Sequence, residues 1–158
     1  MGQENKLVAV DITSNYPKEA KELPSIGYVR ALSAEGVLSL SPTLILGEDD
    51  TGPAAVMEQL SRVGIQIEII PEENTANGII KKVKCIAEIL GVDSIIKDKT
   101  LNNLNAVAKE LKLLSETNKK EPPRVMFILS MESGSPTVGG VDTSAHGLIK
   151  MTGAINVM

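Results

Sequence analysis

The feature that most constrains the fold of this chain is an alternation of short apolar segments with helical patterns in its N-terminal part. Apolar runs at residues 7–11, 43–47 and 65–70 have the length and composition of buried strands. Amphipathic stretches at residues 34–40 and 53–64 lie between them, the second with apolar positions at a spacing of 3.6 residues. Strands that alternate with helices are typical of a parallel sheet whose faces are covered by the helices. The sequence therefore predicts an α/β fold.

Capping residues mark the ends of the predicted helices. Ser33 is a preferred N-cap for the helix at 34–40, and Glu35 is a favourable charge in its first turn. Pro53 is suited to opening the next helix, and Gly64 is suited to its C-terminus.

Further helical and strand patterns follow in the second half of the chain. A helix carrying Cys85 is expected, and an apolar stripe predicts a longer helix over residues 99–120. Residues 124–130 follow two prolines and have the pattern of a fourth strand, after which a glycine-rich loop at 134–140 and a helix at 144–153 are expected.

A long helix between two groups of strands suggests a bridge between two lobes. We predict an N-terminal lobe at residues 1–98, a linker helix at 99–120 and the start of a second lobe at 121–158. The last segment begins a sheet but cannot complete it, because a small isolated piece buries too little apolar surface. We therefore expect a homo-oligomer, of which a dimer that exchanges residues 124–158 is the simplest form.

The charge and the aromatic content argue against nucleic-acid binding. The chain has a net charge of -4, no block rich in Lys or Arg, and as aromatic residues only Tyr16, Tyr28 and Phe127. Nucleic-acid phosphates require cationic patches, and single strands require stacking platforms. No apolar run is long enough to span a membrane, and the first residues lack the apolar core of a signal peptide.

The sequence gives no case for catalysis. Cys85 has no evident activating partner and is expected to be a small core residue. His146 has no second metal ligand at a suitable spacing, so a surface or packing role is expected. Asp142 and Glu132 supply carboxylates, but no nucleophile and base complete a triad with them. The loop at 134–140 matches neither of the phosphate-binding glycine motifs.

Tyr28 and Arg30 point to function most directly. They lie two positions apart between a proline turn and a helix, and if this segment is extended both side chains face the same side. Binding residues are often found on such loops. The alternative is that the ring of Tyr28 packs and Arg30 faces water. The acidic run at residues 48–50 follows a predicted strand, where α/β proteins bind ligands, although solvated loop carboxylates are the simpler interpretation.

The segment YPKEAKELPSIGYVRALSAEGVLSLSPTLIL resembles the N-terminal lobe of the periplasmic haem-binding proteins of bacterial haem ABC importers. These proteins belong to a wider class that includes the vitamin B12 and siderophore binding proteins. Glu35 followed by LSPTLIL is similar to the pattern of the wider class, and GYVRALSAEG is similar to the Gly-Tyr-x-Arg segment of the haem subgroup. PRVMFIL, GSPTVGG and SAHGLIKMTGAIN resemble the start of the second lobe.

The resemblance implies a Rossmann-like parallel-sheet lobe, a long linker helix and a partial second α/β lobe. It implies that Tyr28 ligates ferric haem, and that Arg30 stabilises the phenolate or pairs with a haem propionate. Glu35 matches a residue that docks onto basic residues of the membrane permease. The resemblance further implies a periplasmic location, and that the family's first strand and helix and most of its second lobe lie outside this chain.

The expected function is therefore to capture haem and deliver it to the permease of an ABC importer, as a binding protein and not an enzyme. Two alternatives stay open. One is a binding lobe for another iron chelate or a corrinoid, and the other is a small nucleotide-binding α/β domain.

Overall fold

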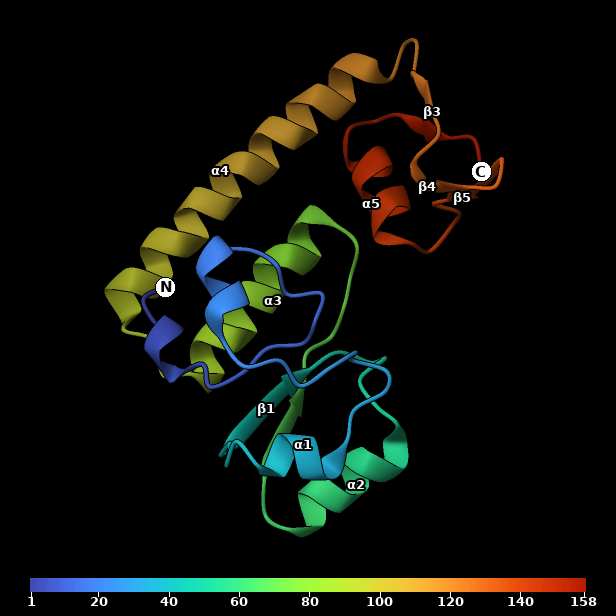
Figure 1. Cartoon of the computed structure of the whole chain (residues 1–158). Coiled ribbons are helices and arrows are strands. Elements are labelled where there is room, and N and C mark those ends of the chain that lie inside the picture. Colours follow the sequence, from blue (N-terminus) through green and yellow to red (C-terminus); the bar gives the residue numbers. More distant parts are fainter. The chain divides into compact units, whose positions relative to one another are not determined.

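The computed structural model describes all residues from Met1 to Met158, and the chain forms two compact units. Unit 1 consists of residues 1–71 and unit 2 of residues 72–158. Figure 1 shows helices and strands in both. The α/β fold expected from the sequence is confirmed. The lobe boundaries at 98 and 120 stay a prediction.

Unit 1 is built on two parallel strands joined through a helix. Strand β1 (Leu44–Gly47) pairs in register with β2 (Gln66–Ile69), so that Leu44 lies opposite Gln66 and Gly47 opposite Ile69. Helix α2 (Ala54–Arg62) connects them, and α1 (Ala34–Leu38) precedes β1. Figure 1 shows both helices beside this small sheet. The parallel pairing is the one that the alternating pattern predicted.

The core of unit 1 lies between its two helices and the sheet. Leu60 has no exposed surface, and it clusters with Ala34 and Val37 of α1. Burying a leucine side chain stabilises a fold by about 1.5–3 kcal/mol. The Ser33 hydroxyl accepts a hydrogen bond of 3.3 Å from the amide of Gly36, which confirms the predicted N-cap of α1.

The predicted strand at residues 7–11 is wrong. The segment makes one isolated parallel bridge, between Val10 and Ser25, and follows a short 3-10 helix, η1 (Glu4–Lys6). The physical reason is a break in the pairing after this bridge. The amide of Ile12 donates a hydrogen bond of 3.0 Å to the carbonyl of Gly27 and not to that of Ile26, which a regular parallel ladder would require. A second 3-10 helix, η2 (Lys18–Glu22), lies just before Pro24.

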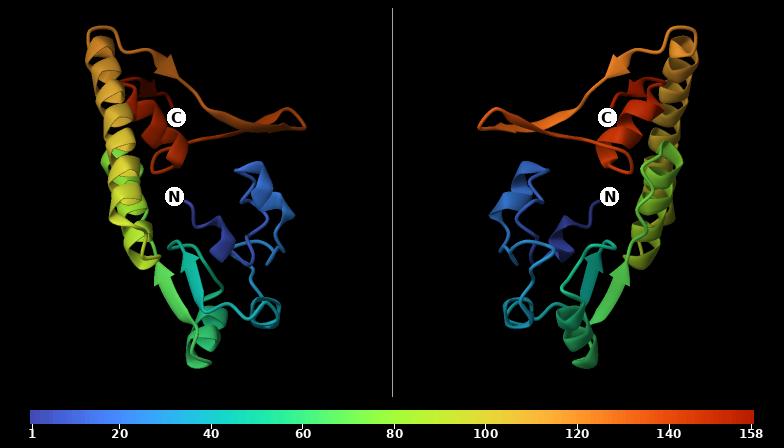
Figure 2. Two further views of the ribbon diagram at one scale, coloured as in Figure 1. Left: turned by 90° about the vertical axis from the view of Figure 1, so that its left-hand side faces the viewer. Right: turned by 90° about the vertical axis from the view of Figure 1, so that its right-hand side faces the viewer.

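Unit 2 begins with two long helices. Helix α3 (Ala76–Ile89) carries Cys85, and α4 (Ser94–Asn118) returns alongside it, as both views in Figure 2 show. The long helix predicted at 99–120 therefore exists but begins earlier, because Asp93 caps it by accepting a hydrogen bond of 2.9 Å from Ile95. No helix is long and apolar enough to cross a membrane.

The single strand predicted at 124–130 is also wrong, because the extended segment divides between two sheets. Strand β3 (Arg124–Val125) pairs in parallel with β6 (Ile155–Asn156), whereas β4 (Ile128–Glu132) pairs antiparallel with β5 (Ser135–Val138).

The turn between β4 and β5 consists of two residues, Ser133 and Gly134, with φ of 49° and 82°. Positive φ at both central positions is the conformation that closes a tight hairpin. Residues 135–138 of the glycine-rich segment that was expected to be a loop are therefore a strand.

Helix α5 (Ser144–Met151) is held by close backbone contacts at two glycines. A Cβ atom at Gly147 would lie 2.4 Å from the carbonyl oxygen of Asn74, and one at Gly153 would lie 2.7 Å from that of Ser115. The Asn118 side chain at the end of α4 also donates a hydrogen bond of 2.8 Å to the carbonyl of Thr152. These contacts seat α5 between the segment before α3 and the end of α4.

Candidate functional site

Tyr28 lies on a surface turn of unit 1 and not on an extended segment. The amide of Ala31 donates a hydrogen bond of 2.8 Å to the carbonyl of Tyr28, which closes a four-residue turn. The argument that placed Tyr28 and Arg30 on one side from strand geometry is therefore wrong. The Tyr28 side chain keeps 42% of its surface exposed.

The turn nevertheless brings the Tyr28 phenol close to the Arg30 guanidinium. The pKa of Arg30 is raised above its usual value, mainly by its hydrogen bond to Asp50 and next by the charge that Tyr28 carries when ionised. The charge of Asp50 acts in the same direction. The phenol and the guanidinium therefore form a local pair on the same turn.

Arg30 is held by Asp50, a residue that the sequence analysis treated only as part of an acidic run. The Arg30 Nε donates a hydrogen bond of 2.9 Å to Asp50 Oδ2, and its terminal nitrogen lies 2.7 Å from the same oxygen. Asp50 follows the carboxyl end of β1. The position of Asp50 after a strand is a sequence signal for a residue of a binding site. Only the fold shows that the partner of Asp50 is Arg30, which lies 20 residues earlier in the chain.

Backbone hydrogen bonds join the Tyr28 turn to the loop after β1. The amide of Gly52 donates a hydrogen bond to the carbonyl of Val29, and the amide of Leu32 donates one to the carbonyl of Gly52. Both hydrogen bonds are 3.0 Å long. Leu32 itself is only 5% exposed. Within the loop, the amide of Glu48 donates a hydrogen bond of 2.8 Å to the Thr51 hydroxyl. The turn thus rests on buried structure, while the Tyr28 and Arg30 side chains are exposed to solvent.

Glu35 lies in the first turn of α1 and is exposed, as the sequence predicted. Its carboxylate stands near the positive end of a short helix, where it is favourable but contributes little to stability. This favourable interaction with the helix N-terminus is the best structural explanation for the charge of Glu35.

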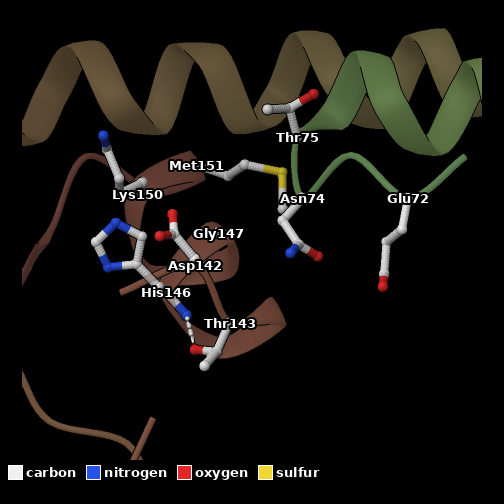
Figure 3. Close-up of a pocket in the computed structure, with 9 residues that line it drawn as sticks. All are labelled: Glu72, Asn74, Thr75, Asp142, Thr143, His146, Gly147, Lys150 and Met151. Atoms are coloured by element: carbon white, nitrogen blue, oxygen red, sulfur yellow. Dashed lines mark hydrogen bonds between the residues drawn. The ribbon is translucent and has the colours of Figure 1, made fainter. Parts of the chain in front are cut away.

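Unit 2 has an open hollow with a volume of about 590 Å³. Residues of the segment before α3 line one side, and His146 and Lys150 of α5 line the other, as Figure 3 shows. Asp142 also lies there, whereas Glu132 belongs to the β4–β5 hairpin. No group of three or more His, Cys, Asp or Glu side chains could hold a metal ion anywhere in the chain.

Arg30 is thus paired with a residue of the loop after β1, at the carboxyl edge of a parallel sheet, where α/β proteins bind ligands. The whole of residues 1–158 matches the family described as "Periplasmic binding protein". The chain belongs to this family.

Solved structures of haem-binding members are similar to this chain over nearly its full length. The periplasmic heme binding protein HutB of Vibrio cholerae is 35% identical, with a TM-score of 0.81 over 98% of this chain. A periplasmic heme binding protein from Pseudomonas aeruginosa is 30% identical, with a TM-score of 0.85 over 98% of this chain. The chain covers 58% and 56% of these two structures.

Curated relatives include other kinds of substrate-binding protein. The ABC transporter substrate-binding lipoprotein YvrC of Bacillus subtilis is 23% identical over 99% of this chain, which covers 50% of that protein. A vitamin B12-binding protein of Vibrio parahaemolyticus is 35% identical over 66 residues, 42% of this chain and 24% of its own length. The chain therefore spans half the length, or less, of these curated relatives.

Proposed function

We propose that this chain is part of a binding protein that captures ferric haem, with Tyr28 as a ligand of the haem iron. The observation that carries the proposal is the Tyr28 phenol beside Arg30, which Asp50 holds in place. Phenolate is a known axial ligand of ferric haem. A neighbouring guanidinium is suited to donate a hydrogen bond to a phenolate oxygen that is bound to iron.

Arg30 has a second role available in this proposal. Its guanidinium has five N–H donors, and the pair with Asp50 uses two of its nitrogens on one carboxylate oxygen. The remaining donors suit a carboxylate such as a haem propionate. Haem is the cargo in this proposal.

Similar proteins support haem more than other ligands. Structures named as periplasmic heme-binding proteins are 30–35% identical to this chain and cover at least 94% of it. Curated vitamin B12-binding relatives match at similar identity but over only 42% of the chain, and a solved vitamin B12-binding protein that covers 96% of the chain is only 20% identical to it. The Tyr28 and Arg30 pair adds a chemical reason, since a corrinoid brings its own cobalt ligands.

The second candidate is a corrinoid or another iron chelate, and the B12-binding relatives are the observation that favours it. A nucleotide-binding domain is a weaker alternative, because residues 135–138 of the glycine-rich segment form β5 and leave no phosphate-binding loop there. Parallel titrations with hemin, cyanocobalamin and ATP separate the candidates. A Soret band with hemin and no response to the other two is expected, and tight binding of cyanocobalamin would contradict the proposal.

Delivery to an ABC importer permease is the second half of the proposed function. Glu35 is exposed in the first turn of α1, where a carboxylate can dock onto basic residues of a membrane partner. The family and its lipoprotein relative support a periplasmic or extracellular location.

Self-association is a further part of this proposal. The β4–β5 hairpin exposes apolar side chains on strand β4, including Leu129 at 70% and Met131 at 63%. An apolar strand with an unpaired edge is a template for another strand. A second copy of the chain is therefore proposed to cover it.

A further inference from the structure

The open hollow of unit 2 contains polar groups that the proposed haem ligand does not use. Figure 3 shows His146, Lys150 and Asp142 close together on one side and Asn74 on the other. His146 and Lys150 are four residues apart on α5, so they share one helix face. Lys150 and Asp142 make no ion pair within the protein, and the Asn74 side chain makes no hydrogen bond there. The hollow is thus lined by groups that can accept a ligand.

The hollow is a built feature of unit 2, because its walls are fixed at both ends of α5. Gly147 allows the helix to lie directly on the backbone of Asn74, where any Cβ atom would collide. The Thr143 hydroxyl caps α5 by accepting a hydrogen bond of 3.2 Å from the amide of His146. The side chains on this face of α5 therefore keep a fixed position relative to the segment before α3.

Asn156 determines which nitrogen of His146 carries the proton. The Asn156 Nδ2 donates a hydrogen bond of 2.8 Å to the carbonyl of Gly139, and its Oδ1 accepts one of 3.3 Å from the amide of Met158. A carbonyl can only accept and an amide N–H can only donate, so these two bonds fix the orientation of the Asn156 amide.

The consequence for His146 is a single neutral tautomer. Nδ2 of Asn156 lies 3.2 Å from His146 Nδ1, so Nδ1 must be the acceptor. The ring proton is then on Nε2, which makes no hydrogen bond within the protein. His146 therefore presents an N–H donor, whereas coordination of a metal ion through Nε2 would require the opposite tautomer.

The charges of the hollow indicate the kind of acceptor that fits. Glu72 lies 4.0 Å from Lys82, which offsets its charge. Lys150 and Asp142 then contribute one positive and one negative charge. Such a lining has too little positive charge for a phosphate or sulfate, but the Lys150 ammonium and the His146 N–H together suit one carboxylate.

We propose that the hollow of unit 2 binds an organic carboxylate through the Nε2–H of His146 and the ammonium of Lys150, and that His146 does not bind a metal ion. The carboxylate belongs either to a free organic acid or to a porphyrin. Only the porphyrin source rests on the proposed function.

The chain's single histidine makes the test direct, because ¹⁵N-histidine labelling gives one set of side-chain signals. NMR should show the Nε2–H tautomer, and sodium propionate should shift these signals saturably while sodium chloride does not. Lys150→Met should weaken the response to propionate about tenfold, the loss of one charge-assisted hydrogen bond. Lys109→Met, an exposed lysine of α4, is the matched control and should leave the response unchanged.

Zinc tests the second half of the proposal. Equimolar Zn²⁺ should leave the His146 signals of the unaltered chain in place. Asn156→Asp supplies an acceptor for an Nδ1–H, frees Nε2 and should create a response to zinc. The Nδ1–H tautomer in the unaltered chain, or a zinc complex at His146 in it, would overturn the proposal whether or not the Asn156 variant folds.

NMR titrations with diamagnetic gallium(III) protoporphyrin and with its dimethyl ester identify which molecule supplies the carboxylate. A shift of the His146 signals with the free acid and none with the ester assigns the carboxylate to the porphyrin. A response to propionate alone assigns it to a free acid, and no response to either overturns the proposal. If Tyr28→Phe shows that haem is not the cargo while propionate still binds, the proposed function fails and this inference stands.

Discussion

At the residue scale, the pair of Arg30 with Asp50 is the contact on which the candidate site depends. Both side chains are well exposed, at 61% and 42%, so the pair is screened by solvent and contributes little to stability. Its effect is geometric, since it restricts a long side chain beside the Tyr28 phenol. Loss of this ion pair should therefore weaken ligand binding at the site and leave the fold unchanged.

Asp50→Ala is the first prediction. The melting temperature should fall by no more than about 2–4 °C, because exposed ion pairs contribute at most about 1 kcal/mol. Hemin affinity should fall about three- to tenfold as Arg30 becomes free to leave the phenol. Thermal melts and hemin titration measure both quantities.

Glu58→Ala is the matched control, because Glu58 forms a similar exposed ion pair with Arg62 on α2, at a distance of 2.6 Å. It should alter neither quantity. Equal losses of hemin affinity in the two variants would show that Asp50 acts through general surface charge and not through Arg30.

Glu35 gives the second prediction at this scale. Glu35→Ala should leave the melting temperature and the hemin spectrum nearly unaltered, since the side chain is exposed in the first turn of α1. In the complete transport system it should slow delivery, most strongly at low ionic strength, where steering by charge is strongest. Loss of hemin binding with normal transport of preloaded protein would instead place Glu35 in the ligand site.

At the scale of elements, the seating of α5 depends on glycines that allow direct backbone contact. Gly147 meets Asn74, and Gly153 meets Ser115 near the end of α4. The sequence analysis predicted the helix, but it had no reason to assign a packing role to either glycine. The close approach of two backbones is a property of the tertiary structure. In the sequence it is visible only as a glycine whose role the local pattern does not explain.

Gly147→Ala is the prediction for this element. The new Cβ would lie 2.4 Å from the Asn74 carbonyl oxygen, so α5 must shift, and a loss of about 1–3 kcal/mol in unfolding free energy is expected. The measurement is urea unfolding followed by circular dichroism.

Gly140→Ala is its control, because a Cβ at Gly140 would meet nothing within 4 Å and its φ is not in the left-handed region. It should be close to neutral. A stable Gly147→Ala variant with an unchanged hollow would show that α5 is not seated as described.

Prediction from sequence succeeded for elements that local signals define. The parallel pair β1–β2, the N-cap Ser33 and the long helix α4 follow from periodicity and capping. It failed at residues 7–11, where the pairing breaks after the Val10–Ser25 bridge, and at residues 124–130, where β3 and β4 pair with different strands. The Tyr28 turn was misread because its residues, Tyr28 to Ala31, include an aromatic and a β-branched residue, which favour strands, and none of the residues that usually mark a turn.

At the scale of the whole molecule, the apolar surface of the β4–β5 hairpin is the surface through which we propose that the chain self-associates. Replacing Leu129, which is 70% exposed, by Lys should disfavour association while leaving the monomer folded. Light scattering at micromolar concentration should show an assembly for the original chain and a shift toward 16.8 kDa for the variant. A clean monomer for both would contradict self-association.

The central claim is that the Tyr28 oxygen ligates the iron of ferric haem, and hemin titration of Tyr28→Phe tests it most directly. Phenylalanine keeps the ring and removes only the phenol oxygen. The original chain should develop a Soret band with a high-spin phenolate charge-transfer band, and the variant should lose the charge-transfer band and bind at least about tenfold more weakly. Tyr16→Phe, at a tyrosine that is 93% exposed, should behave like the original chain. An unchanged spectrum and affinity in Tyr28→Phe would contradict the claim.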